Sequence, residues 1–542
     1  MPTVEEILKE HVTLDIESFD RLYLNGYVPI MQTGPQMVNF LLRHRGYANA
    51  SGALLRRMTK SFIADVEKFA ENNAIPMDSF VGKKKKQRRK DDVANEWRRK
   101  RPVRDDVVFI APAQEKQTSF YIRKEQRAGT QRFLYSRSTV CVKHFYFYID
   151  DADFGPAFIK IGTYAPFPIR VCINGHEWAK RQLEKRGITY ESLDNGFRSC
   201  GQAEELQNIC ESLGPEQIED FFLKWVERLP FPLTAEDRAC GYMHKLSIWQ
   251  MEFSRTQVFD RPVRGREFFE SVIRENIDLG RPDRVQLLFD RKIIRTTPGK
   301  FRTRVITNGV FPSIHINYKS SHLKQYFKEN RAARTEFTIN NTKDFGVKKG
   351  IRNLPYLKRI ARNTNTRLLQ IERVSHDCVL SEASVERLSE PSVTTDGKRA
   401  PGLRPANPRV MSLMAALTLF LHVPDGFRNR DLRRCVAGLM GLQPEEYNAN
   451  RMGYDLRRLR LKGLIFRLPG TTKYELTPYG QRVSLFLTRM NTRLFRPAFG
   501  SIQEDLGVHV PSPLRQAMDK VNSQIDQLLA NAQLEEKKMQ RS

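Results

Sequence analysis

The chain has 542 residues and a formal net charge of +28 at pH 7, from 90 Lys and Arg against 62 Asp and Glu. This length exceeds what one hydrophobic core organises and predicts several domains. Hydrophobic residues make up 40% of the chain, which excludes wholesale disorder. The sequence has no apolar run of about 18 residues, which argues against a membrane-spanning helix. The first residues, MPTVEEILKEH, do not have the pattern of a signal peptide.

The positive charge favours a polyanionic partner, because neutralising phosphates releases condensed counterions. Nucleic acid is the preferred partner, and an anionic membrane surface is the weaker alternative. The seven cysteines have no C-x-x-C spacing, which argues against a zinc ribbon and is typical of a reducing compartment. We therefore expect a cytoplasmic protein. Without a Walker-type phosphate loop or a dinucleotide fingerprint, no nucleotide cofactor is expected.

The pattern of elements predicts an α+β multidomain protein. Apolar residues at helical spacing predict a helical N-terminal region over residues 1–82. Residues 83–104 form a basic connector, either a solvated linker or an arm that contacts nucleic acid. Its candidate contacts are Arg88, Arg89, Arg98 and Arg99.

Short β-prone runs alternate with helical segments over residues 105–380, which predicts a central α+β domain with an antiparallel sheet. Residues 381–407 are rich in Pro, Gly, Ser and charge and predict a linker. A further domain is expected over 408–497. The tail, 498–542, is amphipathic; it either pairs with a second helix in a homo-oligomer or is a frayed end.

The stretch 301–345 has polar and charged residues at every second position, which predicts a small antiparallel sheet. Lys324, Tyr326 and Lys328 share one face of a strand because the side-chain period is two. A turn near residues 330–332 would place Arg334 and Glu336 opposite them. Such a face is costly to bury unless it meets solvent or a polyanion.

Acidic residues at strand positions are candidates for a site that holds Mg²⁺ or Mn²⁺. Asp150 ends the run CVKHFYFYID, where a sheet would fix a carboxylate and a loop would admit phosphate; acids there are also common turn and cap residues. In IWQMEFSRTQ, Trp249, Met251 and Phe253 are expected on the core face, which leaves Glu252 on a polar face. The candidate ligands are Asp150, Glu252 and Glu336.

His176 and Glu177, in the sequence NGHEW, could serve a metal or a proton transfer. A second His four residues on is missing, so this is not a zinc protease signature. A structural role is therefore favoured here.

The pattern K-x-Y-x-K followed by R-x-E, about fifteen residues, resembles a motif of rolling-circle replication initiators and related tyrosine nickases. The resemblance implies that Tyr326 attacks DNA beside metal-binding acids, with Glu336 and Arg334 in the catalytic site and Lys324 and Lys328 on the phosphate. The chain departs from that pattern because it has no His-hydrophobe-His motif; His315 and His322 have six residues between them. Alternatively, Tyr326 stacks on a base or packs on a neighbouring strand.

Residues 408–497 are ordered as helix, helix, helix, hairpin and helix, and this segment resembles the winged-helix domains of MarR-like regulators. The resemblance rests on an Arg-rich third helix, on KGLI before the hairpin and on YELTPYG after it. It implies that the third helix enters a major groove and that the hairpin tip is a wing. Winged helices also mediate protein contacts. The implied DNA contacts are Arg457, Arg458, Arg460, Lys462, Thr471, Thr472 and Lys473.

Three functions follow as hypotheses. The first is a DNA-binding, metal-dependent tyrosine nickase or replication initiator of a mobile element. The second is a non-catalytic winged-helix transcriptional regulator or architectural protein. The third is an RNA-binding protein, since aromatic residues in HFYFYI could stack on unpaired bases, although such a run also suits a buried strand. DNA is favoured over RNA.

Overall fold

The computed structural model describes residues 3–80, 88–127, 130–276, 313–373, 382–393, 397–405, 407–418, 426–443 and 446–491, with five isolated positions between 516 and 527. The chain is a mixed α+β protein with a large antiparallel sheet. It divides into two compact units. The N-terminal unit is Met1–Ser271 with Asp283–Leu369, and the C-terminal unit is Val272–Pro282 with Gln370–Ser542.

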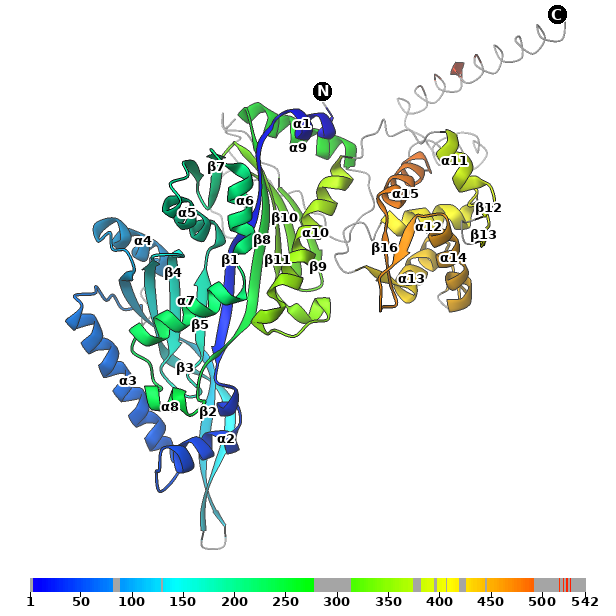
Figure 1. Cartoon of the computed structure of the whole chain (residues 1–542). Helices are drawn as coiled ribbons and strands as arrows, with labels where there is room; N and C mark the ends of the chain where they lie inside the picture. Colours follow the sequence, from blue (N-terminus) through cyan, green and yellow to red (C-terminus); the bar gives the residue numbers. More distant parts are fainter. Residues whose placement is uncertain are drawn as a thin grey trace, which may run out of the picture. The chain divides into compact units, whose positions relative to one another are not determined.

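The N-terminal unit is built on a nine-stranded antiparallel sheet with the order β2-β3-β4-β5-β1-β8-β11-β10-β9 (Figure 1). A separate hairpin pairs β6 with β7. The strands are β1 (Val12–Tyr27), β2 (Asp106–Arg127), β3 (Thr130–Asp151), β4 (Gly155–Gly162), β5 (Ile169–Ile173), β6 (Tyr190–Leu193), β7 (Gly196–Cys200), β8 (Lys245–Phe259), β9 (Ser313–Tyr318), β10 (Ser321–Lys328) and β11 (Ala332–Ile339).

Most of the helices cover one face of this sheet, where apolar residues of the strands are buried, while α4 packs on the opposite face against Phe109 and Tyr148. Phe253 and Phe337 share a core with Leu357 of α10, and Phe145 packs edge-on against Phe62 of α3. In Figure 1, α6, α7 and α10 lie in front of the strands. The helices are α1 (Val4–Glu10), α2 (Gly34–Asn39), α3 (Gly52–Asn72), α4 (Lys90–Lys100), α5 (Gly175–Lys185), α6 (Ala203–Ser212), α7 (Pro215–Arg228), α8 (Ala235–Ala239), α9 (Pro262–Asn276) and α10 (Leu354–Glu372).

The N-terminal region differs from the helical expectation. Helices α1, α2 and α3 are present, but β1 is a strand at the centre of the sheet, between β5 and β8. Its apolar residues Leu14, Ile16, Leu22 and Leu24 are buried, which is the two-residue period of a strand. The prediction of helix is therefore wrong for these residues, and they belong to the same compact unit as the central sheet.

The small sheet expected around residues 301–345 is present from Ser313 onward, and residues 301–312 lie outside the described part. The register pairs Lys324 with Glu336 and Tyr326 with Arg334, which confirms the predicted shared face. The chain reverses through Glu329 and Asn330, which have φ values of 48° and 54°. Such positive φ values are typical of tight hairpin turns.

Trp249 does not join the core, although Met251 and Phe253 do. The register of β1 with β8 pairs Tyr23 with Gln250 and then Leu24 with Ile248. Trp249 is therefore the extra residue of a β-bulge, and its side chain is 37% exposed. The expectation that it faces the core is wrong for this reason.

The C-terminal unit has a helical core and a three-stranded antiparallel sheet of order β14-β16-β15. The segment expected to be a linker, 381–407, contributes α11, and Leu388 and Leu403 are buried in this core. The tail, 498–542, is described only at isolated positions. The elements are α11 (Glu382–Ser389), β12 (Ser392–Val393), β13 (Arg399–Ala400), α12 (Pro408–Thr418), β14 (Phe427–Arg428), α13 (Asn429–Leu439), α14 (Ala449–Leu461), β15 (Ile465–Arg467), β16 (Lys473–Leu476) and α15 (Pro478–Met490).

None of the helices in the described ranges combines the length and apolar character needed to cross a bilayer.

Candidate functional site

A buried polar network forms where β1 bulges at Asp20. The register with β8 shifts between Phe19 and Arg21, and Asp20 accepts a hydrogen bond of 2.6 Å from Ser254 Oγ. The neighbouring strand β5 ends at Ile173, and the side-chain oxygen of Asn174 caps α5 by accepting hydrogen bonds from the backbone N–H groups of His176 and Glu177. This cap places His176 Nε2 2.6 Å from Asp20 Oδ1.

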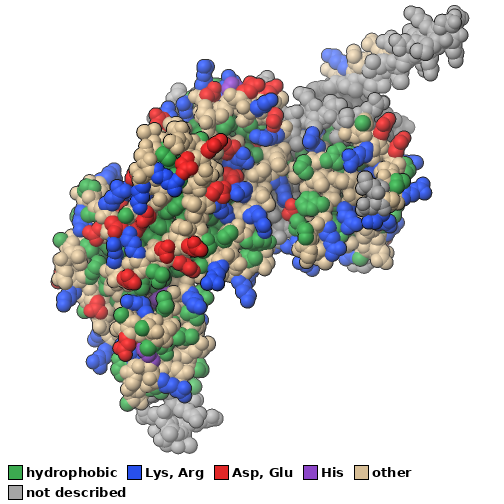
Figure 2. All heavy atoms as spheres, viewed as in Figure 1, with side chains coloured by type: hydrophobic (Ala, Val, Ile, Leu, Met, Phe, Trp, Pro, Cys, Tyr) green, Lys and Arg blue, Asp and Glu red, His purple; other side chains and the backbone are tan. Residues whose placement is uncertain are grey.

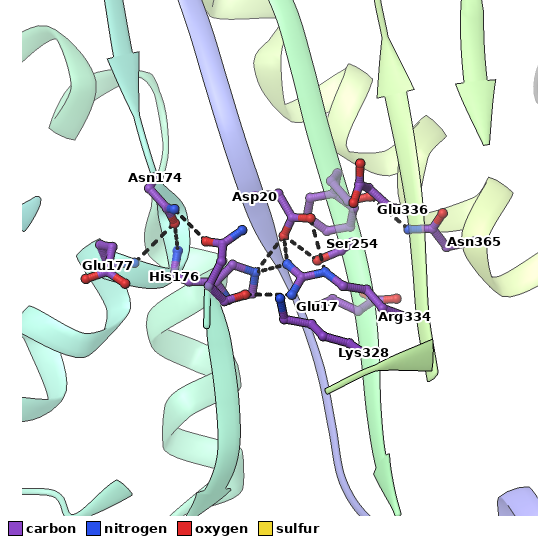
Figure 3. Close-up of polar contacts among 12 residues, drawn as sticks. Glu17, Asp20, Asn174, His176, Glu177, Ser254, Lys328, Arg334, Glu336 and Asn365 are labelled. Atoms are coloured by element: carbon purple, nitrogen blue, oxygen red, sulfur yellow. Dashed lines mark hydrogen bonds and ion pairs between the residues drawn. The ribbon is translucent and has the colours of Figure 1, made fainter. Parts of the chain in front are cut away.

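Arg334 of β11 closes the network. Its Nε donates to Asp20 Oδ2 at 3.2 Å, and its Nη2 also contacts Asp20 Oδ1. Its Nη1 donates to the backbone oxygen of Asn195, in the β6–β7 turn, at 2.6 Å. Figure 3 shows the guanidinium of Arg334 pointing at Asp20, with the ring of His176 beside them.

The Arg334 side chain is fully buried, so it cannot contact a phosphate or a reacting group. The expected catalytic and phosphate-binding role of Arg334 is therefore corrected to a structural one: it fastens β11, β1, α5 and the β6–β7 turn together. The structural interpretation of the NGHEW segment agrees with this placement, because His176 is also buried.

Burial opposes ionisation of Asp20, but the charge of Arg334 and the hydrogen bonds from His176 and Ser254 outweigh it and hold the pKa of Asp20 far below its usual value. Burial lowers the pKa of His176, so this imidazole is neutral at pH 7. The centre of the network is thus a carboxylate held by a guanidinium.

A second, half-buried cluster lies on the same strands. Lys324 Nζ lies 4.0 Å from the centre of the Tyr326 ring, and the Tyr326 hydroxyl donates to Glu336 Oε2 at 3.4 Å. Burial, together with the charges of Asp20 and Glu252, raises the pKa of Glu336 to about 7. Burial also raises the pKa of Tyr326. The arrangement places a carboxyl group that exchanges protons near neutral pH beside a phenol.

Lys328 is half-buried beside this cluster, and burial with the nearby charge of Arg334 lowers its pKa. Its ammonium lies 3.8 Å from Glu329.

Asp150 does not belong to either cluster. It accepts a hydrogen bond of 2.5 Å from Arg181, and β4, β5 and β1 separate its strand β3 from β8. Four strand spacings amount to roughly 19 Å, so Asp150 cannot share an ion with Glu252 and Glu336. The predicted three-acid metal site is wrong in this respect. Over the described ranges, no three or more His, Cys, Asp or Glu side chains are grouped to hold a metal ion.

The basic connector forms α4, which packs on the sheet through Val93 and Ala94. Its candidate contacts lie mainly at the surface. Arg88, Arg89 and Arg99 are exposed, whereas Arg98 is half-buried and donates to Asn95 Oδ1 at 2.7 Å.

The candidate contacts of the C-terminal unit divide into two groups. Arg457 and Arg460 of α14 are exposed. Arg458 donates to the backbone oxygen of Gly402, and Lys462 is 1% exposed and donates to that of Arg387 at 2.6 Å. The expected DNA contacts of Arg458 and Lys462 are therefore corrected to structural roles.

The hairpin tip between β15 and β16 borders a pocket. Thr472 is exposed there, while Thr471 and Lys473 are half-buried. The pocket is lined by Arg428, Arg467, Leu468, Pro469, Gly470, Thr471, Thr472 and Lys473.

Two features of the site escaped the sequence reasoning. The first is Asp20, although a carboxylate amid the apolar residues of a strand is a signal of a buried ion pair. His315 and His322 are separated in the sequence, but antiparallel pairing of β9 and β10 brings His315 Nδ1 to 2.9 Å from His322 Nε2.

Comparison of the chain with known protein families, curated proteins and solved structures gave no match.

Proposed function

We propose that the C-terminal unit is a winged helix that binds duplex DNA. The observation that carries the proposal is an exposed arginine face on α14, directly before a hairpin with a basic, threonine-containing tip. The sheet order β14-β16-β15 pairs this hairpin with the strand that precedes α13. A helix of this kind fits the major groove, and the hairpin then lies along the backbone.

The solvent face of α14 has the composition of a DNA-reading surface. Asn450, Tyr454, Arg457 and Arg460 are all exposed and recur at spacings of three or four residues, which places them along one side of the helix. Asn and Arg side chains read purine edges, and Arg also binds phosphate.

Elements beside α14 add positive charge. Arg430 and Arg434 of α13 are exposed, and Arg428 and Arg467 line the pocket at the hairpin tip. Figure 2 shows blue Lys and Arg side chains on the lower part of this unit, where Figure 1 places α13 and α14. Such clustering supports phosphate contact, because each neutralised phosphate releases counterions.

A double variant tests the proposal. We expect R457Q/R460Q to weaken binding of a mixed-sequence duplex by roughly tenfold to hundredfold, measured by fluorescence anisotropy with the full chain. R482Q is the matched control, because Arg482 is an exposed arginine on α15 of the same unit. Equal affinities of the wild type and the double variant would refute the proposal that α14 binds duplex DNA.

Strand cleavage is a second candidate function, favoured by the contact of Tyr326 with Glu336. In this reaction Glu336 takes the phenol proton and the Tyr326 oxygen bonds to phosphorus. The bond from phosphorus to the 3′ oxygen breaks, the 3′ oxygen takes a proton from water to become a hydroxyl, and the product is a 5′-phosphotyrosine. A divalent cation would neutralise the phosphate, and Glu252 and Glu336 are the carboxylates proposed to hold Mg²⁺ or Mn²⁺.

Supercoiled and single-stranded DNA, incubated with the protein and Mg²⁺ or Mn²⁺, should then be nicked and form a covalent adduct. Y326F should form no adduct. If Y326F cuts as well as the wild type, or if neither protein cuts, the nickase hypothesis is excluded. Duplex binding that persists in E336Q would then support the non-catalytic regulator.

A further inference from the structure

Aromatic side chains form a row across the face of the sheet opposite α10. The register places Phe158 and Tyr23 on either side of Cys172 in adjacent strands. Their ring centres lie 6.4 Å apart, and Trp249 meets Tyr23 edge-on at 5.7 Å. Because of the β-bulge, the Trp249 side chain lies in this row and not in the core. It is the most exposed of the three rings.

Cations border the row. The guanidinium of Arg170 lies 3.9 Å from the centre of the Trp249 ring, and Arg21 is exposed in the strand that carries Tyr23. In the part of the chain that the structure describes, neither arginine forms an ion pair with a carboxylate. Arg170 donates to the side-chain oxygen of Asn25 at 3.4 Å, and Arg21 lies beside Glu252 in register, whereas Lys160 forms an ion pair with Glu115. Both arginines thus add positive charge next to the row.

The row continues towards the half-buried cluster. Arg21 pairs in register with Glu252, and Glu252 pairs with Thr338 of β11. Glu336 is two residues before Thr338, so it lies on the same face. A linear polymer bound along the aromatic row would therefore extend towards Tyr326 and Lys324.

We propose that the surface formed by Tyr23, Trp249, Arg170 and Arg21 binds a single strand of DNA. The exposed ring of Trp249 and the half-buried ring of Tyr23, with cations beside them, suit unpaired bases joined by phosphates, because bases stack on aromatic rings and Arg binds the backbone. Duplex DNA has no free base faces and does not fit such a row. The choice of DNA over RNA rests on the proposed function of the C-terminal unit.

The test measures binding of fluorescein-labelled oligo(dT) by the full chain. W249A and R170Q should each weaken binding roughly tenfold, while W249F, which keeps an aromatic face, should retain most of the affinity. Y121A is the matched control, because Tyr121 is 50% exposed and has Arg123 5.7 Å from its ring centre, but lies on β2. Oligo(dT) should also quench the tryptophan fluorescence of the wild type more than that of W249F.

The variants separate this proposal from the duplex proposal. R457Q/R460Q should lose duplex binding and keep oligo(dT) binding. Oligo(dT) binding that depends on Trp249 would support this surface even if the wild type bound no duplex. The proposal is overturned if the wild type does not bind oligo(dT), if correctly folded W249A and R170Q bind as the wild type does, or if oligo(rU) is strongly preferred.

Discussion

At the scale of single residues, Arg334 and Asp20 form an ion pair enclosed by protein, where neither charge has access to water. Removing the guanidinium leaves the buried Asp20 carboxylate without its charged partner and the Asn195 carbonyl without the hydrogen bond from Arg334. We expect R334M to lower the free energy of unfolding of the N-terminal unit by about 3–5 kcal/mol, measured by urea titration.

The matched control for R334M is R255M. Arg255 donates to Asp15, and the two side chains are 22% and 32% exposed, so its loss should cost only about 0–1 kcal/mol. Similar losses for both variants would contradict the structural role of Arg334.

Glu336 makes a pH-dependent contribution to stability. Its pKa is about 7 in the folded chain, above the usual value, so the folded state binds more protons than the unfolded state between about pH 4.5 and 7. Stability from this group is therefore present at low pH and lost as pH rises through 7.

E336Q removes this titration. Relative to the wild type, we expect E336Q to gain on the order of 2 kcal/mol of stability between pH 4.5 and pH 8. Urea unfolding of both proteins at the two pH values measures this difference. A difference that does not change with pH would contradict the burial of the Glu336 carboxyl group.

At the scale of elements, Gly480 allows α15 to approach the segment before β15. A Cβ atom at this position would lie 1.9 Å from the backbone oxygen of Leu464. G480A should therefore destabilise the C-terminal unit by more than about 2 kcal/mol, whereas G453A, on α14 with nothing within 4 Å of its Cβ, should stabilise it by up to about 1 kcal/mol. Thermal unfolding compares the two, and a G480A protein as stable as the wild type would contradict this packing.

The elements that sequence reasoning found are those whose pattern is local. The β10–β11 hairpin was predictable because polar or charged residues recur at every second position of the two strands and a short turn joins them. Strand β1 was not, because its partners β5 and β8 lie far along the chain and its bulge at Asp20 breaks the alternation. Asp150 is likewise remote from Glu252 because of the order of the strands in the sheet. A local sequence pattern does not predict that order.

Whether a given polar residue is exposed or buried was harder to predict than the positions of the strands. Tyr326, Glu336 and Lys324 do meet, since one face of a hairpin places them together. Burial of Arg334 and Lys462 depends on segments that fold over them from elsewhere, so their charge alone suggested a surface role. Trp249 lies at the surface because the register between β8 and β1 shifts at this residue, and the sequence around Trp249 does not show that shift.

At the scale of the whole molecule, the net charge of +28 agrees with two surfaces for nucleic acid. The C-terminal unit has exposed arginines on α14 and is proposed to bind duplex DNA, and the sheet of the N-terminal unit has rings and arginines that are proposed to bind a single strand. A protein with both surfaces would bind a duplex site and hold a separated strand.

The most direct test of the central claim is the salt dependence of duplex binding by the full chain. For the wild type, the logarithm of the association constant should fall linearly with the logarithm of salt concentration. The slope should be less steep by roughly 2 in R457Q/R460Q, because each lost phosphate contact removes about 0.9. Equal slopes and equal affinities for the two proteins would contradict the account.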